Sequence, residues 1–261
     1  MQIRNKAFLA IIKGLYVQNP CQVSSIAFWK VAQLCQEAET YCHSEKGSRC
    51  LYAFRNQRLE FYWSDDRQHF PISSIEIEWF DFLVLHTDFY ELITDQISGY
   101  EVKASCPLLY DLGSSQGVEY DNKFFITGFN FAEQREFIEA AEVLNQCYET
   151  DNYQAKEVAT WCQLPVFDNS LWLWVRSRTN NEVVGLGIST YQKSIRETYL
   201  DWIQIMPEYR GRGAGRLLVA ETIKRAREKS DIIRVTGIAD DFYRKCGFVG
   251  TERWYTISKK K

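Results

Sequence analysis

Residues 199–215 read YLDWIQIMPEYRGRGAG, and this stretch decides the fold that we expect for the chain. An extended apolar run over residues 199–206 predicts a strand, and a proline and a glycine-rich loop follow it. A helical pattern begins at Ala214. Because the first backbone N–H groups of a helix have no partner within the helix, a strand that ends in such a loop indicates an anion site.

The loop between this strand and helix combines glycines with arginines. Glycine lacks the Cβ atom that would keep a phosphate away from the backbone, and arginine adds positive charge on a forked donor. The loop matches neither the G-x-x-x-x-G-K-[ST] nor the G-x-G-x-x-G pattern, which argues against a nucleoside triphosphate loop and a dinucleotide site. It therefore predicts a cradle for a diphosphate, formed by Arg210, Gly211, Arg212, Gly213, Ala214, Gly215 and Arg216.

Two motifs in this part of the chain resemble those of one family. Residues 210–215 are similar to motif A of the GNAT superfamily of N-acetyltransferases, [QR]-x-x-G-x-[GA], and residues 206–211 resemble its P-E-Y-R-G lead-in. Residues 236–248, TGIADDFYRKCGF, are similar to motif B, N-x-x-A-x-x-F-Y-x-[KR]-x-G-F. Thr236 stands where the family usually has Asn, which weakens the expectation of a side-chain contact to the cofactor there. On both motifs the chain is identified as a member of this superfamily.

The resemblance implies an α/β (α+β) fold of the GNAT type, with a mixed central sheet flanked by helices. We expect this domain at residues 119–261, after a smaller α+β domain at residues 1–118, with the linker near residues 111–117. The pattern of the second domain predicts strands at 123–129, 171–176, 183–190, 199–206, 231–235 and 248–258, and helices at 131–148, 214–229 and 238–245.

The first domain carries no catalytic motif. Its pattern predicts helices at 5–17, from Ser24 or Ser25 to about 43, and at 88–95, with strands at 51–54, 59–63, 75–79 and 100–109. This small α+β pattern permits a remnant of a second acetyltransferase-like half. The aromatic and acidic run over residues 59–79 fits either a pocket for the acceptor substrate or exposed strand faces.

Composition limits the class of protein. The apolar fraction of 46% is typical of a globular chain, and a net charge of −3 argues against a nucleic-acid surface. The eight cysteines form no C-x-x-C pair and no zinc-type spacing, so we expect reduced thiols and no metal. Residues 1–20 do not resemble a signal peptide, and no run is long enough to span a membrane. These features favour a cytoplasmic protein.

The resemblance also implies how acetyl-CoA binds. The backbone at Ile203 and Ile205 would help to bind the thioester arm and polarise its carbonyl, and the amides of residues 212–216 would hold the pyrophosphate. Thr236 and Tyr243 complete the expected set of residues that bind acetyl-CoA, beside the cradle residues named above.

Two residues are the candidates for proton transfer. Tyr243 matches the motif B tyrosine that protonates the departing thiolate in many relatives, although it could instead only pack against Phe242 and Phe248. Asp201 is the leading base, because it shares strand parity with Ile203 and Ile205; the alternative is a structural aspartate at a strand end.

Other residues have simpler interpretations. Glu197 is a second base candidate that we expect to be solvated, and Cys246 is expected in the core.

The sequence thus predicts an acyltransferase that moves the acetyl group of acetyl-CoA directly to a primary amine of a small molecule or peptide. The alternative is a non-catalytic module that senses acyl-CoA and binds a partner through its first domain. No nucleic-acid or membrane partner is expected. A homodimer is compatible with the sequence, which does not fix the oligomeric state.

Overall fold

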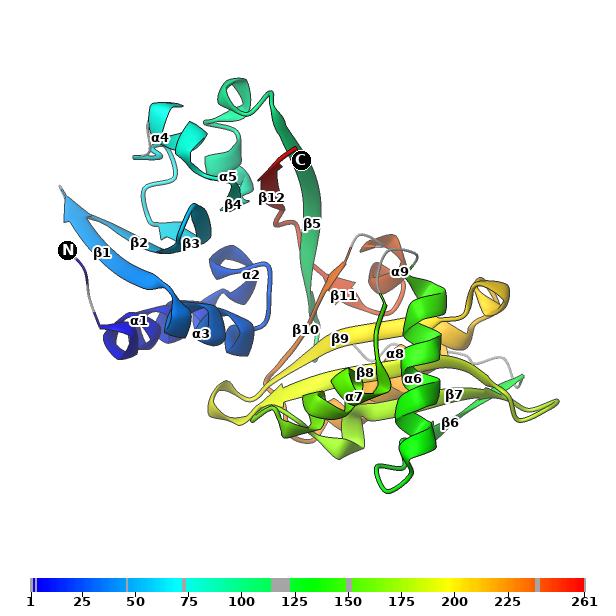
Figure 1. Ribbon diagram of the computed structural model, residues 1–261. Helices are drawn as coiled ribbons and strands as arrows, with labels where there is room; N and C mark the ends of the chain where they lie inside the picture. The colour runs from blue at the N-terminus through cyan, green and yellow to red at the C-terminus, as the bar shows by residue number, and fades with distance from the viewer. Residues whose placement is uncertain are drawn as a thin grey trace. The chain divides into compact units, whose positions relative to one another are not determined.

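The computed structural model describes residues 2, 4–45, 47–71, 74–113, 123–148, 152–237 and 240–260. The chain divides into two compact units (Figure 1). The first unit consists of residues 1–109, 236–240 and 249–261, and the second of residues 110–235 and 241–248.

The second unit is built on a mixed sheet with the strand order β10-β9-β8-β7-β6. The strands β6 to β9 are antiparallel neighbours, whereas β10 lies parallel to β9. The strands are β6 (Phe124–Gly128), β7 (Trp172–Ser177), β8 (Val183–Gln192), β9 (Glu197–Ile205) and β10 (Ile232–Gly237). The other elements are α6 (Gln134–Cys147), α7 (Ala155–Thr160), α8 (Ala214–Arg227), α9 (Asp240–Arg244) and the short strand β11 (Phe248–Val249).

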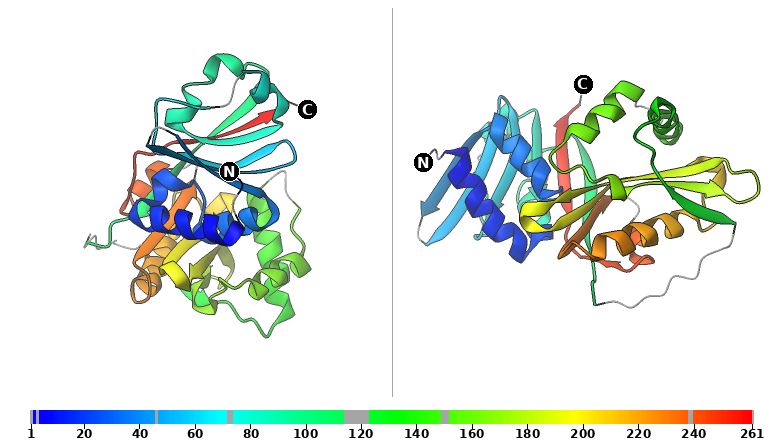
Figure 2. Two further views of the ribbon diagram at one scale, coloured as in Figure 1. Left: turned by 90° about the vertical axis from the view of Figure 1, so that its left-hand side faces the viewer. Right: turned by 90° about the horizontal axis from the view of Figure 1, so that it is seen from below.

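Helices cover both faces of this sheet. The right-hand view of Figure 2 shows α6, in green, on one side of the strands and α8, in orange, on the other. The cluster on the α6 side includes Trp172, Trp174 and Ile188, and the cluster on the α8 side includes Leu173, Val175 and Leu218. The strands therefore alternate between two buried faces, as the sequence pattern of a doubly covered sheet requires. This is the mixed, helix-flanked sheet that the sequence predicted.

The strands of the first unit lie in the order β1-β2-β3-β4-β12-β5, and among them β3 and β4 are parallel neighbours. These strands are β1 (Glu39–Glu45), β2 (Ser48–Arg55), β3 (Arg58–Ser64), β4 (Phe82–His86), β5 (Tyr100–Tyr110) and β12 (Trp254–Lys259). The helices of this unit are α1 (Asn5–Gln18), α2 (Pro20–Val23), α3 (Phe28–Glu37), α4 (Ser74–Trp79) and α5 (Thr87–Tyr90). Short 3-10 helices lie at Thr94–Gln96, Trp161–Gln163, Asn169–Leu171, Lys193–Ile195 and Pro207–Tyr209.

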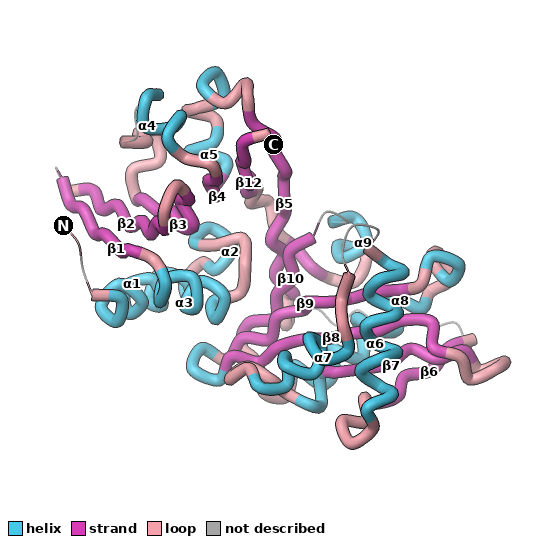
Figure 3. Tube along the Cα trace, viewed as in Figure 1, coloured by secondary structure: helices cyan, strands magenta, loops and turns pink. Residues whose placement is uncertain are grey.

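The structure differs from the sequence prediction in several elements. Residues 74–79 form the helix α4 rather than a strand (Figure 3), since Ile77 is buried while Trp79 on the same predicted face is exposed. The helix predicted to reach residue 43 ends at Glu37, because β1 pairs with β2 and Tyr41 stacks on Tyr52. The helix α7 was not predicted.

The C-terminal strand lies in the first unit. We expected one strand at residues 248–258 within the second domain, but β12 pairs with both β4 and β5. The two compact units therefore differ from the expected division into residues 1–118 and 119–261, whose boundary falls outside the described residues. Ladder hydrogen bonds between segments far apart in sequence hold β12 in this place.

The two units share a local structure that the sequence did not reveal. In the second unit, β9 pairs with β10 only over residues 197–200, and its register with β8 shifts at Asp201. In the first unit, β3 pairs in parallel with β4 only at Arg58 and Leu59, and its register with β2 shifts at Glu60. Each bulge thus places an acidic residue where parallel pairing ends, within the similar sequences Leu-Glu-Phe and Leu-Asp-Trp.

Candidate active site

The central feature of the second unit is the open edge of β9. The parallel pairing with β10 ends at Leu200 and Val235, while β9 continues to Ile205. Within the described residues, the last part of β9 therefore has a strand neighbour only on its β8 side. An open strand edge presents backbone donors and acceptors to another extended group.

The pairing with β8 fixes the direction of the backbone groups along this edge. The Met206 amide donates to the Val184 carbonyl at 3.0 Å, and Ile205 lies opposite Gly185. In an antiparallel ladder, this arrangement turns the amide and carbonyl of Ile205 away from β8, and those of Ile203 with them. The Ile205 carbonyl accepts from Arg210 Nε at 3.0 Å and from Cys147 Sγ at 3.6 Å. The amides of Ile203 and Ile205 point to the open edge.

The bulge decides where Asp201 lies. The residues on either side of it, Leu200 and Trp202, pair with consecutive residues of β8, so Asp201 is the extra residue. The side chain of Asp201 accepts a hydrogen bond from Thr190 Oγ1 at 2.7 Å. Ile203 and Ile205 pack in the cluster beside α8. The expected strand parity of Asp201 with Ile203 and Ile205 is therefore wrong, because a bulge interrupts the two-residue alternation.

The glycine loop has the backbone geometry of an anion cradle. Gly211 and Gly213 have φ angles of +74° and +91°, which only glycine adopts without strain. Gly213 is the N-cap of α8, and no side chain among the described residues caps that end of the helix. Both glycines are exposed. Gly215 has a different reason to be glycine, since a Cβ there would lie 3.1 Å from Phe242 Cζ.

The three arginines of the loop do not have equivalent positions. Arg210 is held by the Ile205 carbonyl, so its guanidinium caps the end of β9. The guanidinium of Arg212 lies 5.8 Å from the centre of the Tyr209 ring. Arg212 and Arg216 are exposed, and the charge of Arg216 acts on the nearby Cys246 thiol. Arg212 and Arg216 are thus the better placed of the three to meet an anion.

Tyr243 is packed into an aromatic group on α9. Its ring centre lies 5.0 Å from that of Phe242 and 5.7 Å from that of Phe248. Burial raises the pKa of the Tyr243 phenol above its ordinary value, and the neighbouring Tyr148 raises it further. The phenol therefore keeps its proton throughout the neutral range. Tyr243 thus packs against Phe242 and Phe248 and also keeps the proton that a general acid needs. A packing role and a proton-donor role are therefore compatible for this residue.

Cys246 follows Tyr243 in this segment and lies in the core, as expected. Its side chain is 4% exposed, and burial raises the pKa of its thiol to about 11. A thiol that stays protonated at neutral pH is a weak nucleophile.

Two other expected positions have different surroundings. Thr236 belongs to the first unit, where its hydroxyl donates to the Ser25 carbonyl. Glu197 is buried rather than solvated, and one of its carboxylate oxygens lies 3.6 Å from Arg234 Nη1. A buried carboxylate next to a buried guanidinium is a structural pair. The motif B residues Ile238 and Ala239 lie outside the described residues.

Sequence reasoning missed several residues at the end of α6. The hydroxyl of Tyr148 accepts from Gln204 Nε2 at 2.7 Å, and the ring of Tyr148 lies against Trp202. Tyr148 also influences the pKa of Tyr243. No motif marks these residues, because the helix and β9 are far apart in sequence. The only feature of the sequence that could have indicated them was the aromatic residue Tyr148, at the end of the helix predicted at residues 131–148.

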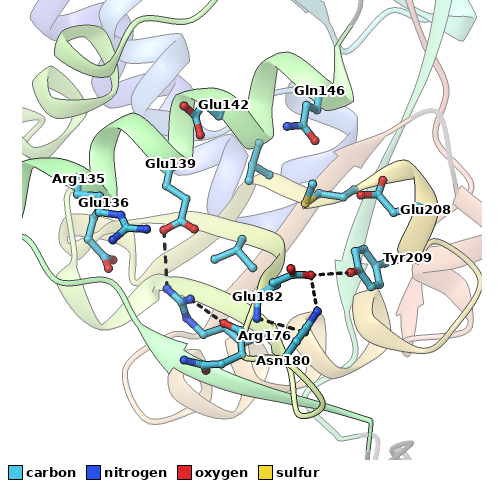
Figure 4. Close-up of a pocket in the computed structure, with 14 residues that line it drawn as sticks. Arg135, Glu136, Glu139, Glu142, Gln146, Arg176, Asn180, Glu182, Glu208 and Tyr209 are labelled. Atoms are coloured by element: carbon cyan, nitrogen blue, oxygen red, sulfur yellow. Dashed lines mark hydrogen bonds and ion pairs between the residues drawn. The ribbon is translucent and has the colours of Figure 1, made fainter.

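A groove of about 590 Å³ lies between α6, the β7–β8 hairpin and the end of β9 (Figure 4). Carboxylates dominate its charged lining, but several already have partners. Glu136 accepts from Trp174 Nε1 at 2.6 Å, Glu139 lies 3.8 Å from Arg176, and Glu182 accepts from Asn180 and Tyr209. Glu142 and Glu208 are exposed and have no ion pair within the described part of the chain.

Comparison with known families agrees with this geometry. Residues 137–248 match the sequence model of the acetyltransferase (GNAT) family. This match covers β9, the glycine loop and α9, so residues 137–248 are a GNAT acetyltransferase domain. Proteins of the family transfer acetyl groups, normally from acetyl-CoA. A search of curated protein sequences finds no significant match.

Solved structures share the fold along almost the whole chain. A GCN5-related N-acetyltransferase from Sphaerobacter thermophilus has a TM-score of 0.70 at 14% identity, over 98% of this chain and 93% of that one. An acetyltransferase of the GNAT family from Colwellia psychrerythraea has a TM-score of 0.59 at 12% identity, over 100% and 99%. A tandem GNAT protein from the clavulanic acid biosynthesis pathway has a TM-score of 0.57 at 6% identity, over 100% and 98%.

Proposed function

We propose that this protein transfers the acetyl group of acetyl-CoA directly to a primary amine of a small molecule or peptide. The observation that carries the proposal is the open edge of β9, where the amides of Ile203 and Ile205 lead to a glycine loop at the start of α8. The residues fit such a substrate. The Cβ position of Gly211 meets no atom within 4 Å, and the uncapped end of α8 offers free amides to a pyrophosphate.

Acetyl-CoA supplies the reactive thioester when bound. The amides of residues 212–216 hold its pyrophosphate, and Arg212 and Arg216 add positive charge. The Ile203 and Ile205 amides pair with the extended arm and polarise the carbonyl. A preorganised amide donor at a developing oxyanion lowers a barrier by about 3 to 4 kcal/mol. Arg210 also fixes the end of β9, because its Nε donates to the Ile205 carbonyl.

The proton transfers are assigned to Asp201 and Tyr243. Asp201 takes a proton from the ammonium group of the acceptor, directly or through water, so that the neutral amine can attack the thioester carbonyl, and Thr190 holds the carboxylate in place. Tyr243 gives a proton to the departing thiolate. Its raised pKa keeps this proton on the phenol at neutral pH. The nitrogen–carbon bond forms as the carbon–sulfur bond breaks. The nitrogen then loses a second proton to become the amide, and this proton restores the Tyr243 phenol through water, while the proton on Asp201 is released to solvent.

The groove beside α6 favours a cationic acceptor. Glu142 and Glu208 have no ion pair within the described residues, and both carboxylates line the groove, which begins at Met206 directly after Ile205. Negative potential in such a groove attracts an ammonium group and raises its local concentration. This supports an amine with positive charge as the acceptor.

The structure of the first unit supports a non-catalytic role for that unit, beside the acetyl transfer that we assign to the second unit. Its bulged β3 and its short parallel pairing repeat the arrangement of β9, which supports a second acetyltransferase-like half. It has no glycine in residues 65–73, after β3, and thus no cradle. The bulge residue Glu60 is held by Arg58 Nε at 2.7 Å and Arg55 Nη2 at 3.6 Å, so its carboxylate is already paired.

A thiol-release assay tests the proposed function. The full chain is incubated with acetyl-CoA and a panel of primary amines, with matched alcohols and carboxylates as controls, and free coenzyme A is measured. Release that depends on the amine, with an acetylated amine as the second product, is expected. Coenzyme A binding by calorimetry without any turnover across the panel would contradict the transferase and favour the acyl-CoA-sensing alternative.

A further inference from the structure

The first unit has a hollow of about 530 Å³ that acetyl transfer does not use. Much of its wall is aromatic, formed by Tyr52, Phe54, Tyr62, Trp79 and Phe80. Among the described residues that line it, Glu76 is the one acidic residue, and none is lysine or arginine. The fixed charge of this wall is therefore negative.

The hollow exists because the helix after β3 is short. In the second unit, the helix after the bulged strand is α8, whose 14 residues pack across β7 and β8. In the first unit, the corresponding helix is α4, which has six residues. A helix of six residues is about 9 Å long, which is too short to cover the neighbouring strands β1 and β2. Side chains on that face of the sheet are left around a hollow.

The pairing of β1, β2 and β3 brings aromatic side chains together on this face. Tyr52 lies opposite Tyr41 on β1 and opposite Tyr62 on β3, and residues directly opposite each other in a ladder share a face. The ring of Tyr41 stacks on that of Tyr52, with 5.0 Å between the ring centres, and on that of Phe54, with 5.5 Å. The sheet side of the hollow is therefore a row of packed rings.

The helix α4 supplies a second wall with both rings and charge. The ring of Trp79 lies edge-on to Phe54, at 6.4 Å between centres and 86° between planes, and edge-on to Phe80 at 5.0 Å and 78°. Trp79 is 47% exposed, so much of its ring is open to a ligand. Glu76 precedes Trp79 by three residues, which places both on one side of the helix, and it is also exposed.

This combination of rings and one carboxylate favours a cation. The face of an aromatic ring attracts positive charge, and the carboxylate of Glu76 adds a full negative charge beside it. Burial raises the pKa of the Cys50 thiol in the same wall, so that thiol carries no charge at neutral pH. A neighbouring hollow of about 400 Å³ is lined by Arg49 and Asp66, whose charges have opposite sign and offset each other.

The cation that fits this wall is organic. A bound Ca²⁺ or Mg²⁺ needs several oxygen ligands, and within the described residues no three His, Cys, Asp or Glu side chains gather as a metal site. Aromatic rings instead suit an alkylammonium group, whose methyl or methylene groups pack on the ring faces while its charge is attracted to them. The volume lies within the usual range for small-molecule sites.

We propose that this hollow binds a small organic cation of the alkylammonium class, with a quaternary ammonium group as the tightest ligand. The alkyl groups of the ligand pack against Phe54 and Trp79, and the carboxylate of Glu76 balances its charge. The site is built from residues that the acetyl transfer does not use, and the proposal does not rest on the proposed function.

The test compares choline with its neutral isostere dimethylbutanol, in which a carbon atom replaces the charged nitrogen. Each is titrated into the full chain, and binding is followed by ligand-observed NMR. We expect choline to bind the tighter by about two- to fivefold or more, because only choline gains the attraction of the rings and the carboxylate. The quaternary nitrogen of choline cannot accept an acetyl group, so this binding is independent of N-acetyl transfer.

A pair of matched variants locates the charge that choline meets. Glu76→Gln should weaken choline by about two- to fivefold and leave dimethylbutanol unchanged. Glu78→Gln makes the same change of net charge on the same helix, outside the wall of the hollow, and should leave both probes unchanged. Trp79→Leu keeps apolar bulk but removes the ring, so it should weaken choline more than dimethylbutanol.

Several results would overturn the proposal. These are an absence of choline binding, equal affinities for the two probes, or equal effects of Glu76→Gln and Glu78→Gln. Choline binding that Glu142→Gln weakens and Glu76→Gln does not would place the cation in the groove of the second unit instead. A dimer that Trp79→Leu dissociates would also contradict the proposal, because a second copy of the chain would then fill the hollow.

Discussion

Tyr243 combines two properties that a proton donor needs, a fixed position and a retained proton. Its ring is held between Phe242 and Phe248, and burial keeps the pKa of its phenol above the ordinary value. We predict that Tyr243→Phe lowers kcat by at least about 100-fold and leaves coenzyme A affinity unchanged, because general acids contribute about 10² to 10⁴. Steady-state kinetics and calorimetry check this.

The control for this variant is Tyr191→Phe. The hydroxyl of Tyr191 donates to the Lys229 carbonyl at 2.8 Å, so its loss should lower stability without lowering turnover. An unchanged kcat in Tyr243→Phe would leave this tyrosine a packing role only. In the unmodified protein, the raised pKa also predicts no loss of kcat from deprotonation of Tyr243 below about pH 10.

Asp201 has a counterpart in the chain that serves as its control. Both Asp201 and Glu60 are bulge residues, but Asp201 accepts from the neutral Thr190 hydroxyl whereas Glu60 is paired with Arg58. We predict that Asp201→Asn lowers kcat/KM by about 10² or more at neutral pH, since the amide cannot accept a proton. Glu60→Gln should leave kcat/KM unchanged. Equal effects of the two substitutions, measured in one assay, would remove Asp201 as the base.

At the scale of elements, the start of α8 depends on backbone shape. Gly213 has a φ of +91°, so an alanine there costs about 1 to 2 kcal/mol of strain and changes the direction of the first amides. We predict that Gly213→Ala weakens coenzyme A binding by tenfold or more in calorimetry. Gly14→Ala is the matched control, since Gly14 lies within α1 with open space around its Cβ position, and it should bind coenzyme A normally.

The bulged strands show how one element can serve two purposes. In β9, the bulge ends the pairing with β10, exposes backbone amides and turns an acidic side chain toward Thr190. In β3, the same irregularity is followed by a loop without glycine and by the six-residue α4. The two units therefore differ in the segment that follows the bulged strand. A glycine loop and the 14-residue α8 follow β9, whereas a loop without glycine and the six-residue α4 follow β3.

At the scale of the whole molecule, buried thiols and phenols make stability depend on pH. Burial raises the pKa of Cys35 to about 12 and that of Cys246 to about 11, from an ordinary value of 9.0. The unfolded chain therefore loses these protons at lower pH than the folded chain does. The free energy of unfolding is fully retained below about pH 9 and falls as the pH rises, by up to about 1.4 kcal/mol per pH unit for each group.

Urea unfolding under reducing conditions, at pH 7.5, 8.5, 9.5 and 10.5, measures this dependence. The midpoint should fall progressively above about pH 9, and Cys35→Ala should make the fall shallower because one such group is lost. A midpoint that rises over this range would contradict the assignment of these thiols to the buried, protonated state.

Two structural features are absent from the part of the chain that is described. Within the described residues, no helix is long and apolar enough to cross a bilayer, and no three His, Cys, Asp or Glu side chains come together as a metal site. The second unit is held by its two apolar clusters, one on each face of its sheet.

The sequence alone located the glycine loop between β9 and α8, because the strand pattern, the glycines and the helical pattern are all local features of residues 199–215. Its contiguous motifs likewise indicated the acetyltransferase (GNAT) family, whose model matches residues 137–248, and it placed Cys246 in the core. Local spacing could not reveal the bulge at Asp201, the use of Arg210 by the Ile205 carbonyl, or the burial of Glu197 beside Arg234.

Only the tertiary structure decided those features, and also the place of β12 between β4 and β5. Each depends on hydrogen bonds or packing between segments that are distant in sequence. A bulge is defined by the neighbouring strand, and a buried pair is defined by the layer that covers it. Residue pattern specifies which groups are present on a strand or helix, whereas the partner across the sheet decides which of them remain free to act.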